Sequence, residues 1–357
     1  EQAERFIESV FTRQYEQATL HVKAFEAFAL KYGSSIMPEP KHIEAELFYN
    51  KAKLFERLTP AYLMLGCVLL ALAFLQVFSS KGISEKARKP LFYTVALLFA
   101  VHTFALALRW YVSGHAPMSD TYESIIYIAW SCLLFSMLFL RTSFFALAGS
   151  TLMAGIFMFV AHLGNIDPEI TNLVPVLKSF WLSVHVSVIT ASYGFLALGC
   201  ALGFFTLILF TCNLSQKSIM AIKHLSIINE VSLIIGLTLL VIGNFLGGIW
   251  ANESWGRYWG WDPKETWSFV SIIVYALILH LRFIPKLNSV YIFSIASLLG
   301  YSSIMMTYFG VNFYLTGMHS YAATGEHASV PSLVYYIFAA IIGLCALAYQ
   351  GRDVKTI

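Results

Sequence analysis

"LSVHVSVITASYGFLALGCALGFFTLILFT", residues 182–211, contains no Asp, Glu, Lys or Arg side chain. A helix needs about 20 predominantly apolar residues to cross the hydrocarbon core of a bilayer. Because that core holds no water, the backbone of such a segment has to satisfy its hydrogen bonds internally, as a helix does. The stretch therefore predicts a membrane-spanning helix, with His185 near one end.

The remainder of the chain has the same character. Hydrophobic residues make up 58% of the 357 residues and charged residues 12%, whereas a soluble domain has about 25% charged residues. We predict an all-α polytopic membrane protein with about nine transmembrane helices. The predicted spans lie near 60–78, 91–109, 124–140, 142–162, 182–211, 230–250, 267–284, 290–310 and 332–349.

Residues 1–57 differ from the rest of the chain because they are charged, and their apolar residues recur at helical spacing, as Ile7, Phe11 and Ala18 do. We expect a short extramembrane helical segment over 1–57, followed by a transmembrane domain over 58–357. Since the chain begins with Glu1 rather than Met, we expect a fragment or a processed product.

The five cysteines lie inside apolar runs and form no C-x-x-C pair, so the sequence contains no thiol redox motif. Any thiols used in its chemistry would belong to a partner. The cysteines are Cys67, Cys132, Cys200, Cys212 and Cys345.

Lys and Arg side chains are distributed unequally between the two sets of loops, and cytoplasmic loops are the ones enriched in them. We therefore place the richer set in the cytoplasm. Residues 1–57, the tryptophan-rich stretch near 255–267 and the loop 311–331 then share the outer face. The richer set includes Lys86, Arg88, Lys217, Lys223 and Arg282, and the poorer set contains Arg109, Lys178, Arg257 and Lys264.

Histidines gather on the predicted outer face. His185 and His319 lie there, and His280 lies inside the span 267–284, where an ionisable residue is costly. Each also has a plainer explanation: His185 as a polar residue at headgroup level, His319 as a solvated loop residue, and His280 as a hydrogen-bond partner of a neighbouring helix. His115, His162 and His327 also lie on the outer side, and His102 lies within the span 91–109.

The stretch "WGRYWGWDPKETW", residues 255–267, contains four of the eight tryptophans, which is denser than an interfacial aromatic belt. Asp262, Pro263 and Glu265 have the pattern of a helix N-cap, first turn and capping box. Asp262 is therefore either purely structural or part of a helix N-terminus that attracts an anion.

Haem combines the properties that these residues would suit. Its ring is flat and apolar, one edge is anionic, and its iron accepts two neutral imidazoles. Because the candidate residues face outward, such a haem would be presented rather than buried.

The residues "WANESWGRYWGWDPKETW" (250–267) resemble the WWD signature of haem-handling cytochrome c biogenesis proteins. "LRWYVSGHAPMSDTYES" (108–124), "FWLSVHVSVITASYGF" (180–195) and "GVNFYLTGMHSY" (310–321) resemble the CcsA/ResC type, the synthetase half of system II. The resemblance covers roughly residues 60–350. Residues 1–57 resemble the end of a CcsB/ResB-type domain, as in CcsB–CcsA fusions.

The resemblance implies that His185 and His319 ligate haem iron at an outer site and act in the reaction. His280 matches a ligand of an inner haem site, whose partner in the family lies in the CcsB half; His102 is a possible substitute. The haem-binding residues implied on the outer face are Trp250, Trp255, Gly256, Tyr258, Trp259, Trp261 and Asp262.

The implied activity is that of a holocytochrome c synthase, which attaches haem b (iron protoporphyrin IX) to the C-x-x-C-H motif of apocytochrome c through thioether bonds. The implied location is a bacterial inner membrane, with the active site on the periplasmic face. The implied partners are apocytochrome c, a CcsB/ResB-type domain or subunit, thioredoxin-like apocytochrome reductants and membrane lipid, but no nucleic acid. A haem exporter or chaperone, a b-type cytochrome and a membrane scaffold remain alternatives.

Overall fold

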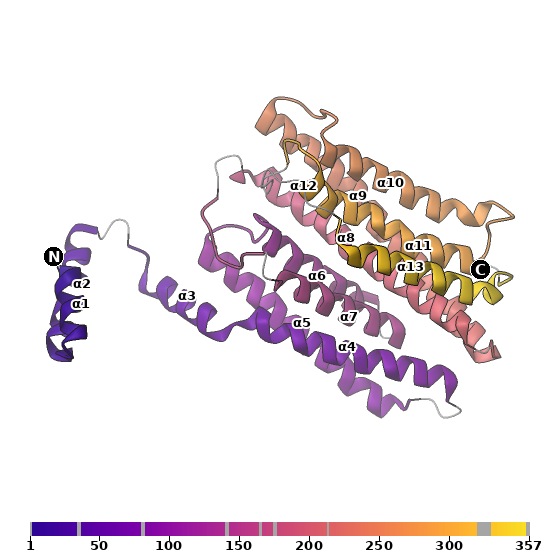
Figure 1. Ribbon diagram of the computed structural model, residues 1–357, viewed down its shortest axis with the longest axis horizontal. Helices are drawn as coiled ribbons and strands as arrows, with labels where there is room; N and C mark the ends of the chain where they lie inside the picture. Colours follow the sequence, from indigo (N-terminus) through magenta and orange to yellow (C-terminus); the bar gives the residue numbers. More distant parts are fainter. Residues whose placement is uncertain are drawn as a thin grey trace. The chain divides into compact units, whose positions relative to one another are not determined.

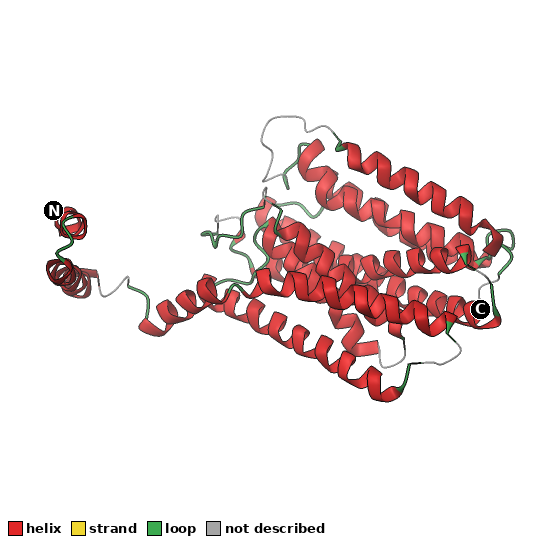
Figure 2. Ribbon diagram, turned by 60° about the horizontal axis from the view of Figure 1, so that its bottom comes forward, coloured by secondary structure: helices red, strands yellow, loops and turns green. Residues whose placement is uncertain are grey.

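The computed structural model describes residues 2–33, 37–79, 83–139, 143–163, 166–173, 177–212, 214–319 and 330–354. These residues form helices joined by loops and turns, with no strand among them (Figure 2). The predicted all-α class is therefore confirmed. The chain divides into two compact units, Glu1–Ala52 and Lys53–Ile357.

The first unit consists of α1 (Gln2–Phe11), α2 (Tyr15–Gly33) and α3 (Pro40–Ala52). The helices α1 and α2 pack against each other. Of the apolar residues at helical spacing, Ala18 is buried, whereas Phe11 and Phe25 are exposed. The apolar stripe predicted from the sequence is therefore only partly covered.

The second unit contains long helices that run side by side (Figures 1 and 2). A π-helical segment, Met306–Gly310 (η3), joins α11 to the short helix α12 (Val311–Tyr314). Each predicted span coincides with one of the long helices. They are α4 (Leu54–Phe78), α5 (Glu85–Ser113), α6 (Thr121–Phe139), α7 (Phe144–Ala161), α8 (Phe180–Thr211), α9 (Gln216–Trp255), α10 (Pro263–His280), α11 (Val290–Met305) and α13 (Ser332–Leu347).

In the part of the chain that the structure describes, eight helices are long and apolar enough to cross a membrane. The predicted span 124–140, which is not among these eight, coincides with α6. The helix α9 exceeds its predicted span 230–250, since its 40 residues reach about 60 Å at 1.5 Å per residue. The chain is a multi-pass membrane protein.

Helix α8 forms the centre of the second unit, in contact with α6, α7, α9 and α11. Its closest neighbour is α9, and glycines make that approach possible. A Cβ atom on Gly236 would lie 2.6 Å from the Leu196 side chain, and one on Gly243 would lie 3.0 Å from the Ile189 backbone. Small residues at helix crossings are typical of membrane proteins, where close van der Waals packing replaces the hydrophobic drive between helices.

We expect Gly243→Val to destabilise the second unit, because the added side chain would collide with the backbone of α8 at Ile189. Overpacking of this kind costs about 1–3 kcal/mol. The measurement is the thermal unfolding midpoint of the purified protein in detergent. Gly343→Val is the matched control, since nothing lies within 4 Å of a Cβ atom at this helical glycine. Equal midpoints for the two variants would contradict the packing argument.

Candidate functional site

The tryptophan segment, residues 250–267, forms a tight connection between α9 and α10. Helix α9 ends at Trp255, and Gly256 terminates it in the left-handed conformation with φ 70°. A glycine suits this position because it lacks the Cβ atom that makes the conformation costly. Asp262 then caps α10, with Pro263 in the first turn and Glu265 completing a capping box. The helix start predicted from the sequence is confirmed.

Glu265 also fixes the loop that precedes α10. Its carboxylate accepts hydrogen bonds from the backbone N–H groups of Gly260 at 2.7 Å and Asp262 at 3.2 Å. The other carboxylate oxygen pairs with the Arg257 guanidinium at 3.0 Å. That guanidinium lies over the Trp255 ring, 5.5 Å from its centroid. The Glu265 carboxylate therefore holds the loop through its backbone N–H groups and through the Arg257 side chain.

Asp262 has a second role besides capping α10. While one oxygen accepts from the Lys264 N–H at 3.0 Å and from His319 Nδ1 at 2.8 Å, the other accepts from the Met318 N–H at 2.6 Å. One buried carboxylate thus ties the chain after α12 to the start of α10. These contacts agree with the structural interpretation of Asp262, whereas the interpretation of the helix N-terminus as an anion site stays a prediction.

The pKa of Asp262 reflects this arrangement. Burial alone would raise it, but the hydrogen bond and charge of His319, together with the Lys264 and Met318 N–H groups, lower it to about 2. A carboxyl whose folded-state pKa lies below its usual value contributes stability above that usual value. The contribution is present from about pH 4 upward and is lost only as the pH falls through about 2.

His185 enters the same site from α8. Its Nδ1 donates to the Gly243 carbonyl of α9 at 2.7 Å, which leaves Nε2 as the acceptor nitrogen. The ring packs directly on the backbone at Gly247. A Cβ atom at this position would lie only 2.6 Å from the imidazole, so the contact requires a glycine. The α8–α9 packing therefore sets both the position and the tautomer of His185.

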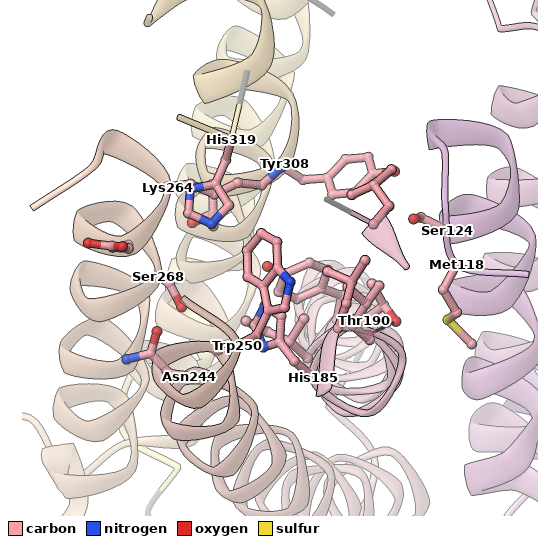
Figure 3. A pocket seen from close by; sticks show the side chains of 18 of the residues that line it. Met118, Ser124, His185, Thr190, Asn244, Trp250, Lys264, Ser268, Tyr308 and His319 are labelled. Carbon is pink, nitrogen blue, oxygen red and sulfur yellow. Dashed lines mark hydrogen bonds between the residues drawn. The ribbon is translucent and has the colours of Figure 1, made fainter. Parts of the chain in front are cut away.

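Trp250 lies between the two candidate ligands (Figure 3). Its indole is stacked on His185, with ring centroids 6.3 Å apart and an interplanar angle of 8°, and it faces His319 at 5.6 Å. Trp255 contacts both Trp250 and His319, at 4.7 and 5.0 Å. In this structure the two imidazoles are brought to one place but separated by a buried indole.

A large pocket opens around these residues, and we call it the outer pocket. It encloses about 1220 Å³ of space not filled by atoms, counted out to its open side. In Figure 3, Lys264 and Ser268 of α10 lie on one side, and Met118 and Ser124 lie on the other. Of the residues singled out from the sequence, His185, Trp250, Tyr258, Trp259 and His319 line it.

The remaining predicted binding residues surround the outer pocket without lining it. Trp255, Gly256 and Asp262 hold the loop and His319 in place by the contacts already described. Trp261 is 69% exposed and has φ 57°, and its ring packs edge-on against Trp259 at 5.6 Å. Trp250 and Trp259 therefore line the pocket, Trp255 packs behind it, and Trp261 lies at its edge.

A buried ion pair holds the opposite side of the outer pocket. Arg109, which the sequence places among the outer-loop charges, is fully buried, and its Nε donates to Glu123 at 2.8 Å. Glu123 also accepts from the N–H and hydroxyl of Ser119, at 2.8 and 2.6 Å. Arg109 in addition donates to the Pro168 carbonyl at 2.9 Å. The start of α6 is thus fixed beside the pocket.

Asp120 lies on that same wall and lines the outer pocket. Burial and the neighbouring Glu123 carboxylate raise its pKa to about 6. The carboxyl is therefore mostly ionised at neutral pH, and it gives the α6 side of the pocket a negative charge.

His280 lies apart from the outer pocket, at the C-terminal end of α10. Its Nδ1 donates to the Ala276 carbonyl at 2.6 Å, and its ring contacts Phe283. The hydrogen bond is made within its own helix rather than to a neighbouring one, and the residue is exposed. The hydrogen bond to Ala276 uses Nδ1, so Nε2 is the nitrogen that is available to another partner.

The other histidines make local contacts. His102 is fully buried, with Nδ1 3.3 Å from the Tyr62 hydroxyl of α4, so the plainer explanation of an interhelical partner fits it. His162 caps α7, with Nδ1 donating to the Met158 carbonyl at 2.6 Å. His115 Nδ1 lies 3.1 Å from the Ala116 carbonyl. His327 lies outside the described residues.

Sequence reasoning missed several polar residues that line the outer pocket. Tyr308 comes from the π-helical segment and Asn312 from α12, while Ser268 comes from α10 and Thr190 from α8. Single hydroxyl or amide side chains inside apolar runs carry little signal by themselves. The π-helical segment is a frequent marker of functional sites, but it is not readable from an apolar pattern.

We expect Asp262→Ala to free the Met318 amide and His319 from their shared anchor. Hydrogen bonds to charged groups contribute about 1.5–3 kcal/mol, so amide exchange at Met318 should accelerate roughly tenfold to a hundredfold. The measurement is hydrogen–deuterium exchange of peptides that cover 315–319, and Asp262→Asn should retain part of the protection. Asp167→Ala, which removes the acceptor of the Glu169 N–H, is the control. Unchanged exchange in Asp262→Ala would show that the carboxylate does not hold this segment.

Known proteins resemble this chain over the same residues. The profile of the family described as "Cytochrome C assembly protein" matches residues 118–319. Protein NrfI of Wolinella succinogenes is 57% identical over 318 residues, which are 88% of this chain and 35% of NrfI. The chain thus spans about a third of that relative's length.

Shorter relatives are matched over most of their own length. The cytochrome c biogenesis protein CcsA of Prochlorococcus marinus (strain MIT 9303) is 34% identical over 264 residues, which are 64% of this chain and 82% of that protein. CcsA of Ranunculus macranthus is 32% identical over 301 residues, 73% of this chain and 94% of its own. The matched residues 118–319 include the whole outer pocket, and the chain belongs to the cytochrome c assembly protein family.

Proposed function

We propose that the outer pocket binds haem b between His185 and His319, and that the protein attaches this haem to apocytochrome c as a holocytochrome c synthase. A role in cytochrome c maturation follows from the family. The finer proposal rests on one observation: two imidazoles flank one aromatic pocket, and Nδ1 of each is hydrogen-bonded to an oxygen of a residue beside the pocket.

The donor set fits an iron porphyrin. Hydrogen bonding of Nδ1 leaves Nε2 of each imidazole as the nitrogen that can bind a metal, and a carboxylate or carbonyl partner is the usual outer support of such a ligand. Trp259 and Tyr258 supply aromatic surface for a flat ring. The Asp262 contact to His319 is the strongest of these supports because it is charge-assisted.

The proposal requires Trp250 to move. Its indole occupies the space between the imidazoles, so both can reach one iron only after the ring has left that space. The porphyrin would then replace the indole as the apolar filling of the pocket.

The chemistry needed from the protein is placement. Each thiol of the C-x-x-C-H motif adds across one vinyl group of haem, so that a C–S bond forms at one carbon and the thiol hydrogen passes to the other. Fixing the ring with its vinyl edge accessible makes this addition effectively intramolecular. The described cysteines of this chain lie within or at the ends of the spanning helices, so the thiols come from the partner.

We further propose that the site faces the periplasm from a bacterial inner membrane, in keeping with the loop charge distribution. A CcsB/ResB-type domain or subunit would precede this chain, and the greater length of NrfI is compatible with that. Thioredoxin-like reductants would keep the apocytochrome thiols reduced. Mass-spectrometric detection of a thioether adduct, formed by the purified protein from haem and a C-x-x-C-H peptide, separates a synthase from a haem exporter.

We expect His185→Ala and His319→Ala each to reduce cytochrome c maturation to background while the protein remains in the membrane. Each change would remove one of the two imidazoles proposed to hold the haem iron, and the iron would then be open to oxidation. Added imidazole should restore part of the activity by filling the vacant position. The measurements are haem-stained cytochrome c in cells and the absorption spectrum of the purified variants. His224→Ala, at an exposed position of α9, is the control; normal maturation in both pocket variants would refute the bis-histidine site.

An inner haem position at His280 is the second part of the proposal. His280 lies 17 residues after Pro263 along α10, about 25 Å at 1.5 Å per residue. The two positions therefore lie near opposite sides of a hydrocarbon core that is roughly 30 Å thick. They are too far apart for one haem to contact both His280 and the tryptophan segment. Haem would therefore pass from an inner to an outer position.

We expect His280→Ala to leave the outer pocket without haem when haem is supplied by the cell. The same variant should bind haem normally when haem is added to the purified protein, because His185 and His319 are intact. The measurement is haem content after purification, compared with a titration in detergent. Wild-type haem content in cells would show that His280 is not on the route.

A further inference from the structure

One wall of the outer pocket carries hydrogen-bond donors that lack matching acceptors. Lys264 lines this pocket, and its ammonium group donates to the neutral Asn312 side chain at 3.2 Å. The ammonium group also lies over the Tyr308 ring, 5.8 Å from the centroid. Among the residues that the structure describes, Lys264 forms no ion pair with a carboxylate. The hydrogen-bond acceptor of this cation is a neutral amide, and the charge of Asp262 acts on it only from beyond ion-pair distance. A cation placed in this way inside an aromatic pocket favours an additional anion.

A further donor faces the same pocket. The Ser268 hydroxyl has no hydrogen-bond partner among the described residues, although this residue is only 3% exposed. Ser268 follows Lys264 by four residues, so both lie on one face of α10. Buried polar groups in native proteins are normally paired, so an unpaired one needs an explanation. An acceptor-bearing ligand in the outer pocket provides it.

The carboxylates near this wall are already occupied. Glu265 accepts from two backbone N–H groups and pairs with Arg257. Asp262 accepts from His319, Met318 and the backbone of Lys264. Neither carboxylate forms an ion pair with the Lys264 ammonium group, so an anionic ligand can bind beside it.

We propose that Lys264, Ser268 and Asn312 form a carboxylate subsite that holds a propionate of the porphyrin. The inference rests on the proposed function, because it assigns the orientation of the same ligand. Propionates and vinyl groups occupy opposite edges of protoporphyrin IX. A propionate at α10 therefore directs the vinyl edge across the pocket, toward the wall that carries Met118 and Ser124 (Figure 3).

The opposite wall disfavours the reversed orientation. Asp120 lines the pocket there. Its carboxyl group lies 3.8 Å from the Arg109 guanidinium, which also pairs with Glu123, so two carboxylates share one cation and a propionate beside them would meet a net negative charge. The neutral vinyl edge meets no such penalty. The attraction at Lys264 and the repulsion at Asp120 thus select the same one of the two orientations.

The test compares a porphyrin with its carboxylate-capped form. Purified full-length protein in detergent is titrated with iron protoporphyrin IX and with its dimethyl ester, and affinity is measured by absorption. Because a charge-assisted hydrogen bond contributes enough for about a tenfold change or more in affinity, the wild type should prefer the free acid by at least that factor. Lys264→Gln should bring the two affinities to within about threefold. It should keep a bis-imidazole spectrum with both ligands.

Matched variants separate a specific subsite from a general effect of charge. Lys178→Gln removes another outer-face lysine, which is exposed, and should leave the preference for the free acid unchanged. Lys264→Arg should retain most of that preference, whereas Ser268→Ala should reduce it by a smaller factor than Lys264→Gln does. A wild-type preference in Lys264→Gln would overturn the inference.

Metal-free protoporphyrin IX distinguishes failure of the subsite from failure of the proposed function. Its binding, measured by porphyrin fluorescence, involves no ligation by His185 or His319. The preference for the free acid over the ester should persist for this porphyrin, both in the wild type and in His185→Ala. If the preference persists while no bis-imidazole spectrum forms with haem, the bis-histidine proposal fails and the carboxylate subsite stands. If the spectrum forms but the metal-free porphyrin shows no preference, the subsite fails alone.

Discussion

The Asp262 carboxylate is the contact on which the outer pocket depends. It caps α10, and through the Met318 N–H and His319 Nδ1 it also fixes a segment that comes two helices later. The His319 ring also packs against Trp250 and Trp255, and the carboxylate adds the hydrogen bond that fixes which nitrogen carries the proton. The same negative charge that suits a helix N-terminus thus also orients an imidazole whose other nitrogen faces the pocket. Glu265 completes the arrangement by fixing the loop between α9 and α10.

His185 is positioned by a different kind of constraint, the close packing of two helices. Glycines let α9 approach α8 so closely that the Gly243 carbonyl can accept from an imidazole of α8. That carbonyl is already part of a helix, so its second lone pair makes the contact. One candidate ligand therefore depends on the membrane-embedded packing and the other on a loop anchored by a carboxylate. We therefore expect substitutions that alter the α8–α9 packing, and substitutions that alter the Asp262 anchor, to change the geometry of the pocket.

Sequence patterns predicted the helices well because apolar length alone decides whether a segment can cross a bilayer. They also predicted the start of α10, since N-cap chemistry is local in sequence. The link between Asp262 and His319 was not predictable, because it joins residues 57 positions apart through a fold that no local pattern encodes. Lys264 was counted as an outer-loop charge, and its contact with Asn312 required the packing of α10 against α12. Arg109 was counted as a loop charge, whereas its burial depends on Glu123, a partner contributed by the next helix.

Trp250 connects these observations to a change of state. Its indole fills the space between the two imidazoles, yet its N–H has no partner there. Burial of a large aromatic ring stabilises this arrangement, while the unpaired donor opposes it. Under the proposed function, a porphyrin in the pocket would replace the lost aromatic contacts with its own surface and would bring a carboxylate to Lys264 and Ser268. The contact that separates the two imidazoles therefore leaves one buried donor unpaired, and the proposed ligand would require that contact to break.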